Sequence, residues 1–290
     1  MSTLFFNNII SAQALHSLPA SEVFIIDARH SLMDLNFGKN AYLEAHIPNA
    51  HFLNMETDLS GDKTGENGRH PLPDLDVLAE KLRTLGLRNE MQVVAYDDAA
   101  GAMAARVWWL LRAMGFERVA VLDGGLGAWC KAGFELNAEI PAPNTNTGTF
   151  TRKTSLNHTV TANDIAAQLP VATLTLVDAR APERYRGEVE PLDPVAGHIP
   201  TAHNQFMMNN IDEHGHFKPA ELLRAQWMEL LGDTPINTVV NYCGSGVTAC
   251  HNLLSMHIAG LDISTTGAAI YPGSWSEWCA DTHRPMAKHS

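Results

Sequence analysis

The chain has 290 residues, of which 45% are hydrophobic and 18% are charged, and its formal net charge is −12. No apolar run approaches the roughly 18 residues that a membrane helix needs, and the 32 acidic residues outnumber the 20 basic ones, which argues against a nucleic-acid-binding surface. The four cysteines form no CxxC pair, so we expect neither a disulfide framework nor a zinc site.

The segment MSTLFFNNIISAQALHSLPA, residues 1–20, contains no Lys or Arg before its short apolar patch. It therefore lacks the basic start of a secretory signal or a transit peptide. We expect a cytoplasmic protein that has neither a membrane nor a nucleic-acid partner.

Short apolar runs alternate with helical patterns in the first half of the chain. Residues 23–27 (VFIID), 93–97 (VVAYD) and 119–123 (VAVLD) predict strands, and ARVWWLLRAMG predicts a helix that ends at Gly115. Such alternation is typical of α/β domains, in which helices cover both faces of a parallel sheet. Ligands of such sheets bind beyond the carboxyl ends of the strands.

Residues 137–153 (NAEIPAPNTNTGTFTRK) are rich in Pro, Asn and Thr and poor in large apolar side chains. This composition favours an extended linker. Because the chain is long for a single core, we predict a first domain over residues 1–140, a linker over 141–156 and a second domain over 157–290.

The two halves of the chain resemble each other in four blocks that keep their order. VFIIDAR (23–29) matches LTLVDAR (174–180), AHIPNAHFLN (45–54) matches GHIPTAHNQF (197–206), VVAYD (93–97) matches VVNYC (239–243), and GGLGAW (124–129) matches GSWSEW (273–278). Four blocks in register indicate a duplicated domain.

The segment that contains the candidate nucleophile is NYCGSGVTAC, residues 241–250, which follows the β-branched residues 238–240. A strand that ends at Cys243 and passes through Gly244 and Gly246 into a helix from about residue 247 surrounds the sulfur with N–H donors. Such a setting favours the thiolate. The first half has Asp97 at this place, so it lacks the nucleophile.

These motifs resemble the tandem rhodanese-like sulfurtransferases. The resemblance covers nearly the whole chain and implies an α/β fold with two tandem rhodanese-like domains, each a parallel sheet with helices on both faces. The loop CGSGVTA is most similar to that of 3-mercaptopyruvate sulfurtransferases, because thiosulfate-preferring rhodaneses have Arg and Lys where this chain has Gly244 and Ser245. A neutral loop suits a singly charged keto acid, and two cations suit dianionic thiosulfate.

The resemblance implies covalent catalysis through a persulfide on Cys243. Sulfur would come from 3-mercaptopyruvate and pass to a thiol acceptor, such as thioredoxin or a small thiol, or to cyanide, with release of pyruvate and without a cofactor or metal. In the family, a proton relay is assigned to the loop serine and to the histidine of the first HIP motif, which here are Ser245 and His46.

The resemblance also implies a substrate-binding set. The family's R-[FY]-x-G segment is matched by residues 184–187, so Arg184 is the candidate for holding the substrate carboxylate. A second arginine that animal members carry further on is missing from GEVEPLDPVAG. The loop residues expected to contact the substrate are Gly244, Gly246, Val247 and Thr248.

Simpler interpretations stand beside these roles. Ser245 can serve only as a helix cap, His46 and its counterpart His198 can serve only to pin a turn, and the other cysteines can be structural. The Asp–Arg pairs that recur in both halves, Asp27 with Arg29 and Asp178 with Arg180, indicate structural ion pairs.

The sequence excludes two kinds of phosphate site and leaves two alternative functions. A thiol phosphatase needs an arginine six positions after the cysteine, where this chain has Ala249, and no GxxxxGK[ST] phosphate loop occurs. Thiosulfate sulfurtransferase is the alternative enzyme. A non-catalytic persulfide carrier or docking module is the alternative outside enzymes.

Overall fold

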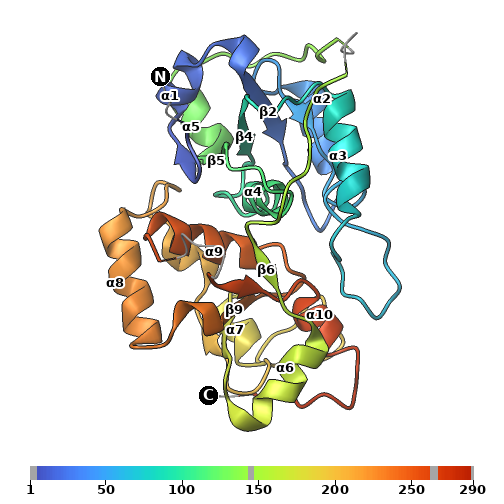
Figure 1. The fold of residues 1–290 in the computed structure, drawn as a ribbon, viewed down its shortest axis with the longest axis vertical. Helices are drawn as coiled ribbons and strands as arrows, with labels where there is room; N and C mark the ends of the chain where they lie inside the picture. Colours follow the sequence, from blue (N-terminus) through green and yellow to red (C-terminus); the bar gives the residue numbers. More distant parts are fainter. Residues whose placement is uncertain (1–4, 143–146, 262–266, 289–290) are drawn as a thin grey trace. The chain divides into compact units, whose positions relative to one another are not determined.

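The computed structural model describes residues 5–142, 147–261 and 267–288. By its contacts the chain divides into two compact units (Figure 1). Unit 1 comprises residues up to 61, 73–156 and 213–216, and unit 2 comprises residues 62–72, 157–212 and those from 217 onward. The segment 62–72 therefore belongs by contact to the unit of Cys243, although it precedes much of unit 1 in the sequence.

Unit 1 contains a five-stranded sheet of strand order β1-β5-β4-β2-β3, in which the strands pair in parallel. Its strands and helices are β1 (Ile9–Ile10), α1 (Ala12–Ser17), β2 (Val23–Asp27), α2 (Phe37–Glu44), β3 (His51–Phe52), α3 (Leu75–Thr84), β4 (Gln92–Tyr96), α4 (Ala104–Ala113), β5 (Val119–Leu122) and α5 (Gly125–Lys131).

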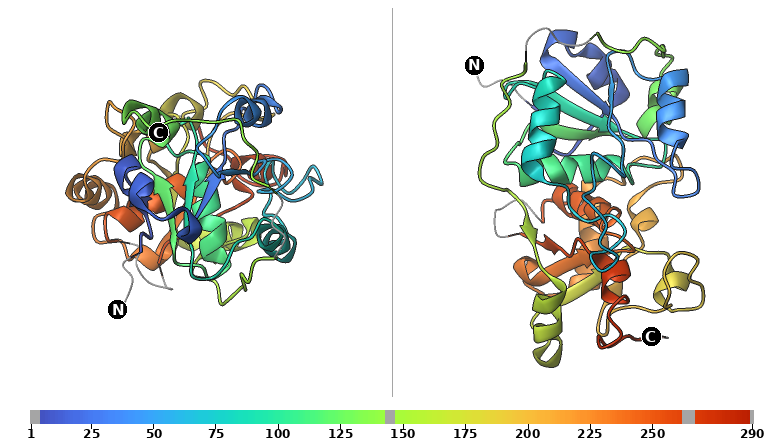
Figure 2. Two further views of the ribbon diagram at one scale, coloured as in Figure 1. Left: turned by 90° about the horizontal axis from the view of Figure 1, so that it is seen from above. Right: turned by 90° about the vertical axis from the view of Figure 1, so that its right-hand side faces the viewer.

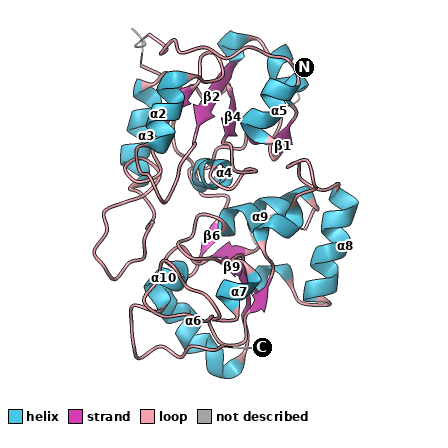
Figure 3. Ribbon diagram, turned by 180° about the vertical axis from the view of Figure 1, so that it is seen from behind, coloured by secondary structure: helices cyan, strands magenta, loops and turns pink. Residues whose placement is uncertain are grey.

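Unit 2 repeats this plan with a five-stranded sheet of order β6-β10-β9-β7-β8, again parallel. Its strands and helices are β6 (His158–Thr159), α6 (Ala162–Gln168), β7 (Thr175–Asp178), α7 (Pro182–Tyr185), β8 (His203–Asn204), α8 (Ala220–Leu231), β9 (Val239–Tyr242), α9 (Ala249–Ile258), β10 (Ala269–Ile270) and α10 (Ser274–Trp278). The predicted class, two α/β domains of one architecture, is confirmed (Figure 3).

The cores follow from the alternation of side chains along the strands. In unit 1, Ile25, Val94 and Leu122 of the sheet share one cluster with Leu15 of α1 and Trp129 of α5. In unit 2 the corresponding face packs Leu176, Val240 and Ala269 against Ile165 of α6 and Trp275 of α10. On the other face, α4 contacts β4 and β5, and α9 contacts β9 and β10, so helices cover both faces of each sheet (Figure 2).

Glycines in the sequence predicted the end of α4 and the approximate start of α9. The helix α4 ends before Gly115, whose φ of 76° suits a glycine after a helix end, and its N–H donates to Arg112 O at 2.9 Å. The helix α9 begins at Ala249, two residues after the expected start at about Val247.

The described part of the predicted linker lies on unit 1. Phe150 is fully buried and meets the ring of Phe116 edge-on, at 5.6 Å between centroids. The Phe150 N–H donates to Leu87 O, and the Lys153 N–H donates to Met114 O. Residues 143–146 lie outside the described residues. The segment from 147 to 156 is therefore bound to one unit rather than freely extended.

Candidate active site

The thiol of Cys243 lies one residue beyond the end of β9, with 2% of the residue exposed. The Gly246 N–H donates to its Sγ at 3.2 Å, which is the hydrogen bond expected of a loop that curls around the sulfur. The Cys243 N–H in turn donates to Ser274 Oγ at 3.1 Å. The buried sulfur therefore has a backbone donor aimed at it.

Backbone N–H groups at the start of α10 bind the loop that contains Cys243. The Trp275 N–H donates to Cys243 O at 3.0 Å, and the Ser276 N–H donates to Gly244 O at 2.9 Å. Gly246 has a φ of 79°, and a β-carbon there would lie 2.2 Å from Pro272 O. A residue with a side chain does not fit at position 246, so this glycine is required by the path of the loop.

Ser245 and His70 form the one side-chain hydrogen bond that pairs a hydroxyl with an imidazole beside this loop among the described residues. Ser245 Oγ lies 2.7 Å from His70 Nδ1, and both residues are buried. The residue that caps α9 is Thr248, and its side chain makes no capping bond. Ser245 therefore interacts with a histidine of the segment 62–72 instead of capping the helix.

His46, the histidine that the sequence suggested for the relay, lies in unit 1. Its Nδ1 lies 2.6 Å from Tyr42 O and its Nε2 lies 3.1 Å from Glu139 O, and its ring stacks on Tyr42. His198 has the matching arrangement in unit 2, with Nδ1 2.7 Å from Tyr185 O and its ring stacked on Tyr185. Burial lowers the pKa of His198. Both histidines thus tie a helix end to the following turn.

No sequence signal points to His70. It lies in GRHPLP, a segment between β3 and α3 without regular structure, and its partner Ser245 is 175 residues away. Periodicity detects helices and strands, so it carries no information on a contact made by an irregular loop.

Arg184, the candidate for binding a carboxylate, lies on α7 with 18% of its side chain exposed. Its Nη2 donates to Glu190 Oε1 at 2.7 Å and to Asp193 Oδ2 at 3.3 Å. Its Nη1 lies 3.5 Å from the position that a β-carbon on Gly244 would occupy. The guanidinium therefore reaches the residue next to Cys243.

Arg69 approaches the same residue from the segment 62–72. Its Nη2 lies 2.8 Å from the same β-carbon position on Gly244, and its Nη1 pairs with Asp193 Oδ1. Burial and the nearby Arg184 lower the pKa of Arg69, and the interaction with Cys243 partly offsets this by raising it. No motif in the sequence points to this residue.

The corresponding loop of unit 1 holds Asp97, whose carboxylate is fully buried. Oδ1 accepts from the N–H groups of Ala99 and Gly101, both at 2.9 Å, and Oδ2 accepts from those of Met103 and Ala104, at 2.7 and 2.8 Å. Backbone donors before α4 therefore surround a built-in anion.

The recurring Asp–Arg pairs are structural, as predicted. Arg29 Nη2 donates to Asp27 Oδ2 at 2.6 Å and to Ala45 O at 2.7 Å. Arg180 Nη2 makes the equivalent bonds to Asp178 Oδ2 at 2.7 Å and to Gly197 O at 2.6 Å. Each pair joins a strand end to the residue before the HIP motif of its own unit.

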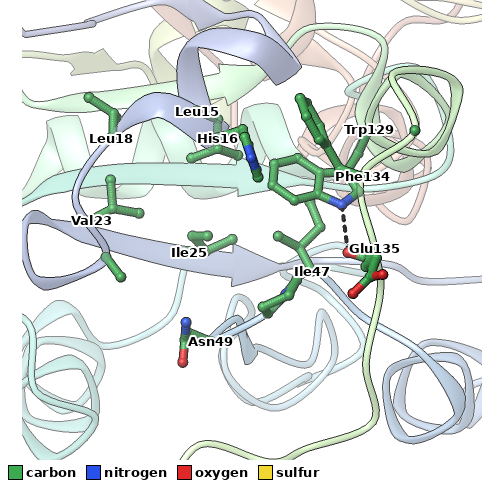
Figure 4. A pocket seen from close by; sticks show the side chains of 13 residues that line it. Leu15, His16, Leu18, Val23, Ile25, Ile47, Asn49, Trp129, Phe134 and Glu135 are labelled. Carbon is green, nitrogen blue, oxygen red and sulfur yellow. Dashed lines mark hydrogen bonds between the residues drawn. The ribbon is translucent and has the colours of Figure 1, made fainter.

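A cavity of about 550 Å³ lies in unit 1 (Figure 4). Leu15, Val23, Ile25 and Trp129 contribute to its largely apolar wall. The ring of His16 at its edge stacks on Phe134. None of the residues predicted for catalysis or substrate binding lines this cavity.

The family model of the rhodanese-like domain matches residues 11–132 and 161–281, which covers most of both units. The chain belongs to the rhodanese family. Its two matched domains agree with the internal repeat, and the sulfurtransferase type expected from the motifs is confirmed.

Relatives of this tandem rhodanese include enzymes with two different donors. A Pseudomonas aeruginosa protein named "Probable 3-mercaptopyruvate sulfurtransferase" is 45% identical over 283 residues, which is 96% of this chain and 97% of that protein. Bovine thiosulfate sulfurtransferase is 33% identical over 261 residues, covering 88% of this chain and 84% of its own. The structure of 3-mercaptopyruvate sulfurtransferase from Leishmania major matches with a TM-score of 0.83 at 28% identity, over 97% of this chain and 76% of that one.

No helix within the described part of this rhodanese is long and apolar enough to cross a membrane.

Proposed function

We propose that this rhodanese transfers sulfur from 3-mercaptopyruvate to a thiol or to cyanide through a persulfide on Cys243, with release of pyruvate. The observation that carries the proposal is the Ser245–His70 hydrogen bond next to the nucleophile. Pyruvate leaves as an enolate that must gain a proton, whereas the sulfite released from thiosulfate is a stable anion and needs none. A hydroxyl–imidazole pair therefore suits the keto-acid donor.

The first half-reaction follows from the placement of these groups. The Cys243 thiolate attacks the sulfur of the donor, the bond from that sulfur to C3 breaks, and its electron pair forms the enolate of pyruvate. A proton delivered through Ser245 from His70 reaches C3 and gives pyruvate. The outer sulfur remains on Cys243 until the acceptor thiolate or cyanide attacks it and restores the thiolate.

The persulfide anion needs hydrogen-bond donors beyond the one from Gly246. In the corresponding loop of unit 1, two backbone N–H groups bind Oδ2 of Asp97, an atom that lies two bonds beyond Cβ. The outer sulfur of a cysteine persulfide also lies two bonds beyond Cβ. By analogy, we expect the N–H groups at the start of α9, from Thr248 and Ala249, to hold the outer sulfur. Val247, which precedes these two residues, is buried.

Arg184 is the proposed binder of the donor's carboxylate. Its guanidinium reaches Gly244, and a carboxylate beside Gly244 lies within a few bonds of the sulfur that Cys243 attacks. Charge-assisted bonds from arginine to carboxylate are among the stronger ones in proteins.

Mass spectrometry of the reduced protein tests the proposal. After separate incubation with 3-mercaptopyruvate and with thiosulfate, the intact mass shows whether one sulfur was added, peptide mapping shows where, and a pyruvate assay shows the co-product. We expect fast loading of Cys243 by 3-mercaptopyruvate with release of pyruvate, and much slower loading by thiosulfate.

Thiosulfate sulfurtransferase is the second candidate, and the two guanidiniums beside Gly244 favour it. Faster loading by thiosulfate would establish it. Loading by neither donor would leave the protein as a persulfide carrier that is charged by a partner.

A further inference from the structure

We propose that the cavity of unit 1 binds a small organic cation that has a flat aromatic ring and an ammonium group. The cavity has a volume of about 550 Å³, which lies within the roughly 300–1,000 Å³ typical of small-molecule sites (Figure 4). Its lining residues belong to unit 1, and none of them belongs to the loop of Cys243 or to the segment 62–72. The proposal is therefore independent of the sulfur donor.

The first argument is that unit 2 closes the same place in its own copy of the fold. The cavity there has a volume of about 10 Å³, enough for no more than about one water molecule. Leu176 lines it, as the matching Ile25 lines the cavity of unit 1. Thr201 and Asn49 also correspond, and their φ values are 67° and 64°. The fold therefore forms without a cavity at this place.

Shorter side chains leave the cavity open in unit 1. In the matched blocks, unit 1 has Val23 where unit 2 has Leu174. The short 3₁₀ turn that precedes each of these positions contributes Ala20 in unit 1 and Leu169 in unit 2. An empty apolar space costs stability, because the side chains around it lose contacts. A space that only one of the two repeats keeps open therefore favours a ligand.

The second argument is that the wall suits a flat ring. Aliphatic side chains from α1 and β2 line one part of the wall, and the rings of Trp129 and Phe134 line another (Figure 4). The Phe134 ring stacks on His16 with 3.9 Å between the centroids, and the Trp129 ring lies 4.9 Å from that of Phe134. An aromatic ligand gains both buried apolar area and contacts with these rings.

The third argument is charge. Among the described residues that line the cavity, Glu135 is the one Asp, Glu, Lys or Arg. Glu135 is exposed, so a ligand whose ring fills the apolar part can reach the carboxylate with an ammonium group. The net charge of −12 also attracts cations rather than anions to the protein.

Tryptamine is the probe, because it combines an indole ring with an ammonium group. Its binding is followed by NMR of the full chain with labelled methyl groups. We expect the signals of Leu15, Ile25 and Ile47 to shift with a Kd on the order of 0.1 mM. The signals of Ile165 and Leu176, which line the closed cavity of unit 2, should not move. Absence of shifts at the three residues of unit 1 would overturn the proposal.

Two analogues and two variants test the charge. Tryptophol has a hydroxyl in place of the ammonium group and should bind about three- to fivefold more weakly than tryptamine. The anion indole-3-acetate should bind more weakly still. Glu135→Gln should remove the advantage of tryptamine over tryptophol, whereas Glu44→Gln, at an exposed carboxylate of unit 1 outside the cavity, should keep it. Equal affinities of the wild type for the three ligands would overturn the proposal of a cation site.

Filling the cavity tests its location. The double variant Ala20→Leu with Val23→Leu gives unit 1 the side-chain lengths of unit 2. We expect tryptamine to bind it at least about tenfold more weakly, while sulfur transfer stays within about twofold, because neither residue lies in the candidate active site. Val23→Leu alone is the milder variant and should weaken binding about threefold. Wild-type affinity for tryptamine in these variants would mean that the ligand binds elsewhere, and would overturn the proposal.

Discussion

The loops that follow β4 and β9 occupy the same place in two copies of one fold, yet they contain different anions. In unit 1 the Asp97 carboxylate accepts four backbone N–H bonds, so the anion is part of the chain. In unit 2 the Gly246 N–H donates to Cys243 Sγ at 3.2 Å, and it is the one backbone donor to this sulfur among the residues that the structure describes. Within the described residues, the Cys243 sulfur therefore accepts fewer backbone hydrogen bonds than the Asp97 carboxylate does.

The two loops share their backbone requirement. Gly101 and Gly246 have φ values of 84° and 79°, and each donates its N–H to the residue at the strand end. Both halves thus place a backbone donor beside the residue that follows the strand. Under the proposed function, the identity of that residue decides whether the loop holds a permanent anion or takes part in catalysis. This comparison predicts different consequences for changes in the two loops.

The largest expected effect is the loss of the nucleophile. Cys243→Ser should reduce turnover by at least about 10³-fold, because a serine hydroxyl does not form a persulfide. The control is Cys250→Ser. Cys250 is buried near the loop, and its Sγ contacts Gly246 O at 3.4 Å, but no step requires it. Steady-state release of pyruvate measures both variants, and equal losses would mean that the nucleophile has been misassigned.

The next effect concerns stability rather than turnover. In Asp97→Asn, an amide N–H₂ group takes the place of the carboxylate oxygen that accepts from the N–H groups of Met103 and Ala104. These two buried donors therefore lose their acceptor. We expect the free energy of unfolding to fall by about 3 kcal/mol. Urea denaturation measures this change.

Asp98→Asn is the matched control for Asp97→Asn, because Asp98 is the adjacent residue and is exposed. It should change the free energy of unfolding by less than about 1 kcal/mol. If both variants unfolded at the same urea concentration as the wild type, the carboxylate of Asp97 would not be the built-in anion that stabilises its loop.

A smaller effect distinguishes two histidines. His70→Asn removes the partner of Ser245 and should lower kcat for 3-mercaptopyruvate about 10- to 100-fold, since general acid–base catalysis contributes on this scale. His46→Asn disturbs a turn of unit 1 and should lower stability while leaving kcat within about threefold. A large loss of kcat in His46→Asn alone would return the relay to the HIP histidine that the family resemblance suggested.

The sequence predicted those parts of the fold that have strong local signals. The strands at 23–27 and 119–122, the helix ending before Gly115, the duplication and the position of Cys243 all rest on apolar runs, glycines or the internal repeat. Strands of two residues, such as β1, β6 and β8, are too short to show a period. They exist because a longer neighbouring strand pairs with them.

The sequence suggested candidate site residues only where they lie on a motif. Cys243, Ser245 and Arg184 stand in recognisable segments, whereas Arg69 and His70 come from an irregular loop. The Arg69 N–H bonds to Ser276 Oγ, 207 residues away in the sequence. Such contacts depend on how the tertiary fold brings segments together, and no local propensity encodes them.

The smallest expected effect compares His51 and His203, which hold the same place in the two repeats. His51 pairs with Ile26 in the sheet and stacks on Phe24, and burial lowers its pKa to about 4. His203 pairs with Val177 and is exposed. Between pH 6.5 and pH 4 the imidazole of residue 51 binds a proton in the unfolded chain but stays largely neutral in the folded chain. Protonation therefore stabilises the unfolded chain, and the free energy of unfolding should fall as the pH decreases toward 4.

Part of the His51 ring is exposed, so we expect this loss to be only about 1 kcal/mol at pH 5. Urea denaturation at pH 7 and pH 5 measures it against two variants. In His51→Gln the difference between the two pH values should shrink by that amount, because glutamine does not titrate. In His203→Gln the difference should equal that of the wild type. If His51→Gln kept the full difference in free energy of unfolding between pH 7 and pH 5, the acid sensitivity would arise from other groups. The burial of His51 would then not make unit 1 differ from unit 2 in its response to pH.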